Sequence, residues 1–254
     1  MTEQPTILAN AHYRDLRKAR YDLAVLPWGA TEPHNFHLPY GTDILESELI
    51  ATEAARIAHI QGSRLIVLPT VPYGVNTTQL DIPLTISINP STQMALLHDI
   101  VSSLEAHGIP KLVILNSHGG NDFKQMIREL QTRHTIYICS VNWWVSLDAK
   151  EYFEEPGDHA GELETSLMMH VAPELVLPLS EAGPGKERRP KIRGFREGWA
   201  WAPRPWTKIT DDTGVGNPAA ATPSKGERYF IAVTEKVGEF FAQLAAANLD
   251  HMFE

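Results

Sequence analysis

The sequence of 254 residues contains a single cysteine, Cys139, so neither an intramolecular disulfide nor a cysteine-based zinc cluster can form. Cys139 stands in an apolar stretch and is expected to be a small buried residue, which fits a reducing compartment. No apolar run approaches the ~18 residues of a membrane helix, and residues 1–20 lack the apolar centre of a signal peptide. These absences predict a cytoplasmic protein without membrane contact.

Basic residues are in the minority, with 22 Lys and Arg against 31 Asp and Glu. The net formal charge of −9 argues against nucleic acid as a partner, because phosphate neutralisation needs clustered cations. The most basic patch, residues 186–196, lies in a stretch rich in proline and glycine and is expected to be a solvated loop. The chain is instead notable for eleven histidines, several of them beside carboxylates and glycines.

Apolar runs alternate with segments of helical period along most of the chain. This order predicts an α/β fold, a three-layer sandwich in which helices flank a mostly parallel central sheet, with the active site at the carboxyl ends of the strands. Residues 183–224, which include Trp199, Trp201 and Trp206, break the rhythm and predict an irregular lid or subunit contact within a single domain, 1–254. Expected strands are 23–28, 64–68, 111–116 and 135–141, and expected helices are 43–59, 89–107, 121–134 and 225–248, with another beginning near residue 163.

The first polar cluster follows the first expected strand, where residues 29–43 read Gly-Ala-Thr-Glu-Pro-His-Asn-Phe-His-Leu-Pro-Tyr-Gly-Thr-Asp. Glu32, His34 and Asp43 offer carboxylate oxygens and imidazole nitrogens, which are ligands of zinc, manganese and iron. A Glu-x-His pair on extended backbone places both side chains on one face. The alternative is a polar loop whose acids cap the helix that begins near Asp43. This loop alone does not decide between them.

The second cluster, Asn-Ser-His-Gly-Gly-Asn at residues 116–121, follows the third expected strand. Gly119 and Gly120 let the backbone turn sharply with its N–H groups exposed, and the helix expected next adds a positive dipole end. His118 would sit over this turn and bind a metal or a substrate, while the glycine amides donate to an oxyanion.

The third cluster, residues 157–166, leads into a helix and contains His159, a candidate general acid or base. Glu162 and Glu164 project about 200° apart on a helix, so at most one joins a site while the other caps the helix or meets solvent. All three clusters fall on one rim of the expected sheet. Their carboxylates Glu32, Asp43 and Glu164 carry three negative charges, which two divalent ions and one hydroxide would balance, so a dinuclear site is favoured.

Together these clusters resemble the creatininase (creatinine amidohydrolase) family. The first follows the family pattern Gly-x-Thr-Glu-x-His-Gly-x-His-Leu-Pro-x-x-Thr-Asp, with Asn35 in place of a glycine. The motifs Asn-x-His-Gly-Gly-Asn and His-Ala-Gly-x-x-Glu-Thr-Ser stand at residues 116–121 and 159–166. The resemblance implies an α/β sandwich assembled as a homo-oligomer, a hexamer, with one or two zinc, manganese or iron ions per chain, zinc foremost.

The resemblance also implies roles for individual residues. Asp43 would bridge two ions, and Glu164 would be a further ligand and a catalytic candidate. His159 matches the catalytic histidine that protonates the leaving nitrogen after water attacks the amide carbon. The implied metal ligands are Glu32, His34, Asp43, His118 and Glu164.

Two departures from the family bear on the substrate. Creatininase proper has a metal-binding glutamate two residues after the ligand histidine, where this chain has Gly120, so creatinine is not the expected substrate. The family segment that matches residues 73–86 usually carries a histidine near Gln79 and a glycine near Leu84. Substrate contacts in this segment are therefore expected to differ.

Some side chains keep two interpretations. His37 is expected to orient a ligand from behind, or else to bond to backbone within its loop. Trp143 and Trp144 follow a strand end and would form an apolar wall for a planar amide, or anchor the core or an interface. Gly119 and Gly120 are the other expected substrate contacts.

The sequence therefore predicts a metal-dependent amidohydrolase that uses activated water to cleave a C–N bond, other than a peptide bond, of a small cyclic or linear amide. The alternative is a non-catalytic metal- or ligand-binding protein on the same fold, in which Gly120 marks loss of the second metal. Retention of His159 and Glu164 argues against it. A nucleotide-binding protein that uses Gly119 and Gly120 for phosphate ranks last, because no established glycine-rich fingerprint is present.

Overall fold

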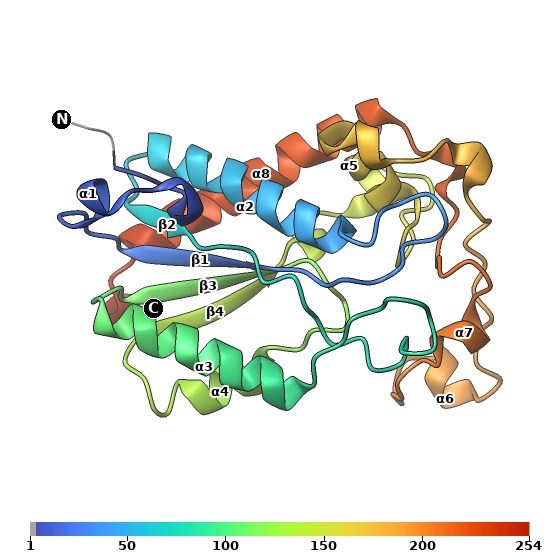
Figure 1. The fold of residues 1–254 in the computed structure, drawn as a ribbon, viewed down its shortest axis with the longest axis horizontal. Coiled ribbons are helices and arrows are strands. Elements are labelled where there is room, and N and C mark those ends of the chain that lie inside the picture. Colours follow the sequence, from blue (N-terminus) through green and yellow to red (C-terminus); the bar gives the residue numbers. More distant parts are fainter. Residues whose placement is uncertain (1–3, 254) are drawn as a thin grey trace.

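The computed structural model describes residues 4–253. A sheet of four parallel strands in the order β2-β1-β3-β4 forms its centre (Figure 1). β1 and β3 are buried along their whole length, which explains why β1 and the four central residues of β3 are continuously apolar rather than alternating. The expected α/β fold with a parallel sheet is confirmed. The strands are β1 Leu23–Trp28, β2 Leu65–Val67, β3 Lys111–Asn116 and β4 Tyr137–Asn142.

Helices cover both faces of the sheet (Figure 1). One face carries α2 (Thr42–Ile60), α5 (Glu162–Val171) and α8 (Pro223–Ala246), and the other carries α3 (Pro90–Ala106) and α4 (Lys124–Leu130). Three single-turn helices are α1 (Tyr13–Leu16), α6 (Arg193–Arg196) and α7 (Trp206–Ile209). The described residues also include 3-10 turns at Leu8–Asn10, Trp143–Val145, Ala149–Glu151, Pro173–Leu175, Leu179–Glu181, Pro218–Ala220 and Leu249–His251.

One expected helix start is wrong. The helix expected from Asn121 begins at Lys124, because the Asn121 side chain is used elsewhere. Its Nδ2 donates to Asn116 Oδ1 at 3.0 Å, and its Oδ1 accepts from the backbone of Val75 at 3.1 Å and from Gln93 Nε2 at 2.9 Å. Asn121 therefore clamps three segments together and leaves the turn after β3 non-helical.

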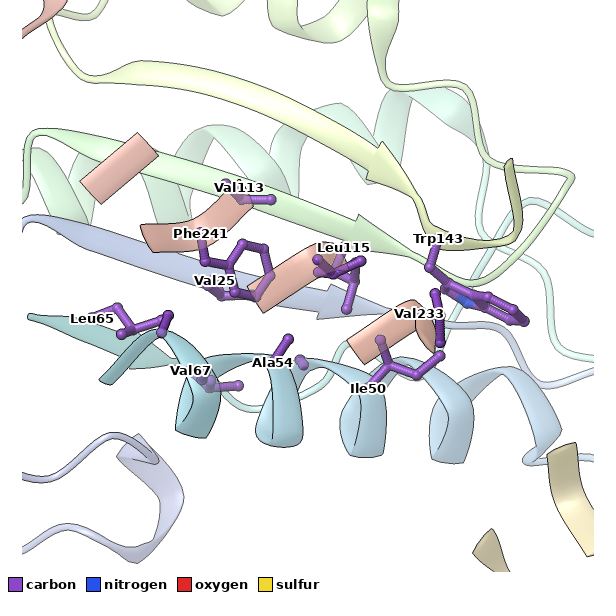
Figure 2. Packing of buried hydrophobic residues seen from close by; sticks show 14 of the residues in the cluster. Val25, Ile50, Ala54, Leu65, Val67, Val113, Leu115, Trp143, Val233 and Phe241 are labelled. Carbon is purple, nitrogen blue, oxygen red and sulfur yellow. The ribbon is translucent and has the colours of Figure 1, made fainter. Parts of the chain in front are cut away.

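The hydrophobic core lies in two layers, one on each face of the sheet. Successive residues of a strand point to opposite faces, so Val25 of β1 packs toward α2 and α8 while Leu26 packs toward α3 and α4. Figure 2 shows the first layer, where Ile50 and Ala54 of α2 and Phe241 of α8 meet the strands. Cys139 of β4 packs beside this layer, and burial raises the pKa of its thiol to about 12.

The carboxyl ends of three strands lie at the same edge of the sheet. Trp28 pairs with Asn116, and Asn116 pairs with Asn142, so the segments after β1, β3 and β4 leave from neighbouring points. These are the segments that carry the three polar clusters of the sequence. No helix among residues 4–253 is both long and apolar enough to cross a membrane.

A buried lysine lies at the amino end of β3, opposite the edge that carries the polar clusters. Lys111 begins β3, and its Nζ donates to the backbone oxygens of Leu244 at 2.8 Å, Ala245 at 2.9 Å and Ala247 at 2.7 Å. These carbonyls belong to the end of α8 and the residue after it, where no further helical turn supplies donors. The ammonium group therefore ties the start of the central strand to the C-terminus of the longest helix.

We expect Lys111→Met to lower the free energy of unfolding by about 1–3 kcal/mol, because three carbonyls lose a charged donor. Urea denaturation measures the change. Lys236→Met, at an exposed position of α8, is the matched control and should change stability by less than about 0.5 kcal/mol. Equal losses in the two variants would contradict the capping role.

Candidate metal centre

Three acids and three histidines from separate segments gather at the carboxyl edge of the sheet. All are buried except Glu164, which is half-buried. The parallel sheet brings them together because the loops after β1, β3 and β4 start side by side. Glu32 and His34 come from the β1–α2 loop, Asp43 from the first turn of α2, His118 from the turn after β3, His159 from the loop before α5, and Glu164 from the first turn of α5.

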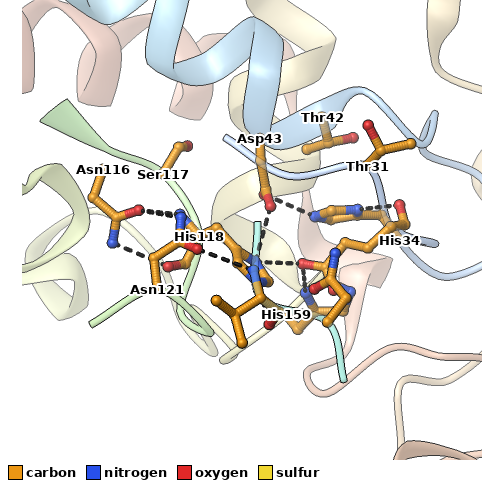
Figure 3. A network of polar contacts seen from close by, with 12 residues as sticks. Thr31, His34, Thr42, Asp43, Asn116, Ser117, His118, Asn121 and His159 are labelled. Carbon is orange, nitrogen blue, oxygen red and sulfur yellow. Dashed lines mark hydrogen bonds and ion pairs between the residues drawn. The ribbon is translucent and has the colours of Figure 1, made fainter. Parts of the chain in front are cut away.

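Asp43 lies at the centre of this cluster (Figure 3). Its Oδ1 is 3.1 Å from His34 Nε2, and its Oδ2 is 3.1 Å from His118 Nδ1. Two donor sets result, Glu32 with Asp43 and His118, and His34 with Asp43 and Glu164, and the donor atoms within each set lie within 4.8 Å of one another. Asp43 belongs to both sets and offers one oxygen to each, which is the arrangement that a bridging carboxylate requires.

Backbone carbonyls hold the two histidines in place. His34 Nδ1 lies 3.1 Å from the backbone oxygen of Glu32, and His118 Nε2 lies 3.2 Å from that of Val75. An imidazole that donates one N–H to a carbonyl leaves its other nitrogen free to accept a proton or a metal. In both residues that other nitrogen faces Asp43.

The charge of the cluster fits divalent cations. Asp43 Oδ2 is buried and makes no hydrogen bond, although it lies close to His118. Burial disfavours a charged imidazole at His34, yet Asp43, Glu164 and Glu32 raise its pKa to about 10, and the His118 pKa is also raised well above its usual value. The carboxylates thus favour positive charge within the cluster. The imidazole nitrogens and carboxylate oxygens together suit zinc or manganese.

His159 lies beside the two donor sets. Its Nε2 donates to the backbone oxygen of Pro33 at 2.8 Å, and its Nδ1 lies 3.9 Å from Glu32 Oε1. The ring centroid is 4.1 Å from that of His34 and 5.2 Å from that of Trp206, whose plane is nearly perpendicular. The nitrogen that makes no hydrogen bond therefore faces the cluster, where it can exchange a proton or join Glu32 and His34 as a third donor set.

The glycine turn after β3 is required by its neighbours. A Cβ at Gly120 would lie 2.3 Å from the backbone oxygen of Val75 and 2.4 Å from His118 Nε2, so any side chain would displace His118. Gly119 and Gly120 line the cavity, and within residues 4–253 their N–H groups make no hydrogen bond. The position that carries a glutamate in creatininase proper is thus closed to side chains here.

Two buried residues beside the cluster were not found from the sequence. Gln79 Nε2 donates to Glu32 Oε2, and its own Oε1 is buried without a partner. Glu46 lies one helical turn after Asp43, 3.4 Å from Ser117 Oγ. Burial, with the nearby charges of Glu164 and Asp43, raises its pKa well above the usual value. The i, i+3 spacing on α2 was the available signal for Glu46, and the segment that usually carries a histidine was the signal for Gln79.

Other expected site residues lie around this cluster. His37 Nε2 is 2.9 Å from Thr165 Oγ1, so it contacts the neighbour of Glu164 rather than a donor residue itself. Trp143 is 1% exposed and packs in the core, whereas Trp144 is half-buried and lines the cavity more openly. Glu162 does not meet solvent as one interpretation expected, because it is fully buried and paired with Lys225 Nζ at 2.5 Å.

The cluster opens into one large cavity of about 1990 Å³. Its floor contains Glu32, Asp43 and His118, and much of its wall comes from residues 187–209. Figure 1 shows this segment, with α6 and α7, beyond the carboxyl ends of the strands. The basic patch expected to be only a solvated loop is exposed, but it also lines the cavity.

Comparison with known families agrees with the motifs. The family model described as "Creatininase: Creatinine amidohydrolase" matches residues 9–241. The chain belongs to this family. The creatininase-family chain is 30% identical over 223 residues to the mycofactocin precursor peptide peptidase of Mycobacterium ulcerans (strain Agy99), covering 83% of this chain and 81% of the relative.

Solved structures share the fold of this creatininase-family chain. A crystal structure of a candidate creatinine amidohydrolase from Bacteroides fragilis NCTC 9343 superposes with a TM-score of 0.91 at 46% identity and covers 100% of both chains. A manganese form of creatininase gives a TM-score of 0.77 at 20% identity over 95% of this chain and 99% of that one. A mutant creatininase of Zn-Zn type gives 0.75 at 20%, over 95% and 98%. At these lower identities the likeness establishes the fold.

Asn35, which replaces a family glycine, ties the first loop to the irregular segment. Its backbone φ is 55°, a left-handed conformation that asparagine tolerates better than most residues. Its Nδ2 donates to the backbone oxygen of Gly183 at 3.0 Å, and its Oδ1 accepts from the Gly183 N–H at 2.8 Å. Leu84, near a position where the family usually has glycine, has a φ of 60°.

We expect Asn35→Gly to be less stable than the natural protein but more stable than Asn35→Ala. Both variants lose the hydrogen bonds to Gly183, while alanine also adds about 1–2 kcal/mol for the left-handed backbone. Urea denaturation gives the order, and faster amide exchange around Gly183 should accompany both changes. An Asn35→Ala protein that matches or exceeds Asn35→Gly in stability would contradict this account.

Proposed function

We propose that this protein is a metal-dependent amidohydrolase that cleaves the C–N bond of an amide with water. The observation that carries the proposal is the pair of donor sets that share Asp43, with His159 beside them at the floor of a large cavity. Family membership supports a hydrolase. The proposed metal donors are Glu32, His34, Asp43, His118 and Glu164, with Zn²⁺ foremost and Mn²⁺ or Fe²⁺ as alternatives.

The donor chemistry and the relatives both support divalent ions. Imidazole and carboxylate donors suit zinc, manganese and iron alike, and structures of creatininase are named for manganese and for a zinc pair. When bound, such ions would acidify a water molecule and polarise the amide carbonyl. The negative charge of the three carboxylates supports two ions rather than one.

Residues of the chain supply the remaining steps of the proposed reaction. His159, held through Nε2 by Pro33, presents Nδ1 toward the cluster, where it would protonate the leaving nitrogen. The N–H groups of Gly119 and Gly120 would donate to the amide oxygen as it gains negative charge. Gln79 and Thr165, which contact Glu32 and His37, would keep the acids and histidines oriented.

The cavity favours a linear amide over a small ring. Its volume of about 1990 Å³ exceeds the ~300–1,000 Å³ of ordinary small-molecule pockets. Gly120 removes the glutamate expected of creatininase proper, and one relative is named for cleaving a precursor peptide. We therefore propose an acyclic amide, peptide or non-peptide, as the substrate. From the family resemblance we also propose a homo-oligomer, which light scattering after size exclusion would test.

Metal content tests the site directly. We expect close to two ions per chain by elemental analysis after loading with Zn²⁺, and loss of at least one ion in His118→Ala because a donor set loses its only histidine. His107→Ala, at an exposed position after α3, should keep the natural content. No bound metal in the natural protein after loading would overturn the proposed site.

Activity tests the role of His159. We expect His159→Ala to retain its metal content and to lose about 10²- to 10⁴-fold in kcat, because a proton donor to the leaving nitrogen is removed. The assay is hydrolysis of a panel of cyclic amides, formamides, N-acyl amino acids and short peptides by the zinc-loaded protein. A metal-loaded natural protein that cleaves none of them would support the non-catalytic binding protein instead.

A further inference from the structure

The positive charge of this acidic chain is concentrated in one segment. Residues 186–208 contain eight Lys or Arg and two Glu, a net formal charge of +6 in a chain whose total is −9. Like charges gathered in one segment repel one another unless an anion or an acidic neighbour offsets them. Such a concentration is offset by water and salt where the side chains are exposed, by acidic partners within the fold, or by an anionic ligand.

Most of these cations line the cavity that contains the candidate metal centre. Lys186 and Arg193 do not contribute to its wall. The three acids of the candidate metal centre, Glu32, Asp43 and Glu164, line the same cavity and, in the part of the chain that the structure describes, form no ion pair with these cations. The six cations of the wall are Arg188, Arg189, Lys191, Arg196, Arg204 and Lys208.

Only two of the six cations are offset by acidic side chains. Arg188 pairs with Asp211, and Arg204 lies 2.7 Å from Asp158 and 3.6 Å from Glu187. Within residues 4–253, the other four cations form no ion pair. We call these four the cationic wall, Arg189, Lys191, Arg196 and Lys208.

Other acids of the cavity do not pair with the cationic wall. Asp122 accepts from the backbone of Lys124, and Glu129 pairs with Arg133 at 2.8 Å. Both belong to the side of the cavity that α4 and the turn before it provide. The cationic wall is thus left with solvent or a ligand to balance its charge.

Arg204 connects the cationic segment to the proposed catalytic histidine. Its guanidinium lies 4.9 Å from the ring centroid of Trp206, and the Trp206 ring lies 5.2 Å from that of His159. Its ion-pair partner Asp158 directly precedes His159 in the chain. Arg204 therefore lies next to the proposed catalytic histidine, and other residues of the same segment line the same cavity.

We propose that the cationic wall forms a second subsite that binds an anionic group of the substrate, a carboxylate or a phosphate, away from the bond that is cleaved. The inference rests on the proposed function in one respect, namely that the substrate's amide lies at the metal centre. The cavity volume of about 1990 Å³ can hold both the amide group and the anionic group of a linear substrate. The positive electrostatic potential of the cationic wall would attract the anionic group. The substrate class is therefore an anionic, acyclic amide.

Binding of three matched peptides to the zinc-loaded protein tests the subsite. The peptides are acetyl-Ala-Ala-Gly-Ala-Xaa-amide, in which Xaa is aspartate, phosphoserine or asparagine, and calorimetry gives their dissociation constants. We expect an anionic peptide to bind at least about tenfold more tightly than the asparagine peptide at low salt, and the difference to shrink at high salt. The order of aspartate and phosphoserine identifies the preferred anion.

Two double variants locate the effect. Lys191→Gln/Arg196→Gln removes two cations of the cationic wall, and we expect the preference for the anionic peptide to fall below about threefold. Lys186→Gln/Arg193→Gln removes the same two residue types from the same segment outside the cavity, and should keep the natural preference. The Arg193 pair with Glu197 is exposed, so its loss should cost little stability.

The outcomes separate the subsite from the proposed function. Equal binding of the three peptides, no binding of any of them, or equal losses in the two double variants would overturn the subsite. Preferential anion binding by a zinc-loaded protein that hydrolyses no amide would support the subsite and contradict the proposed function. Amide hydrolysis by a protein that shows no preference for the anionic peptides would support the proposed function and overturn the subsite.

Discussion

Buried negative charge at the carboxyl edge of the sheet is the constraint on which the rest of the structure depends. Glu32 and Asp43 are buried and Glu164 is half-buried beside them, and carboxylates in such a place are stable only if positive charge or hydrogen bonds offset them. The same carboxylates raise the pKa values of His34 and His118, because they favour the positively charged imidazole. Each acid is fixed to a different segment of a folded core, so the fold holds this charge in place for cations to neutralise.

Backbone groups and amides, rather than further charges, determine the direction of each donor. Carbonyls of Glu32 and Val75 orient the two histidines, and Asn116 with Asn121 fixes the turn that carries His118. A neutral carbonyl or amide can hold an imidazole without adding charge to an already charged site. Parallel register provides the common starting point for these loops, since Trp28, Asn116 and Asn142 lie opposite one another.

Sequence patterns predicted what depends on neighbouring residues, and missed what depends on distant ones. Continuous apolar runs identified β1 and β3, and the common edge of parallel strands predicted that the three polar clusters meet. The local sequence predicts a helix start at Asn121, whereas its side chain contacts Val75 and Gln93, which lie far away along the chain. The role of Gln79 likewise depends on a distant contact, because its partner Glu32 lies 47 residues earlier in the chain.

The separation of charge within the cavity explains how an acidic chain can bind an anion. The chain has a net formal charge of −9, but part of its negative charge lies on Glu32, Asp43 and Glu164 at the candidate metal centre, where divalent ions would neutralise it. Among the other acids of the cavity, Glu129, Asp158 and Glu187 are paired with arginines outside the cationic wall. Asn35 adds a mechanical link, because it fastens the loop of Glu32 and His34 to Gly183, at the start of the irregular segment. Recognition of an anionic group and alignment of the metal donors therefore depend on two segments that are hydrogen-bonded to each other.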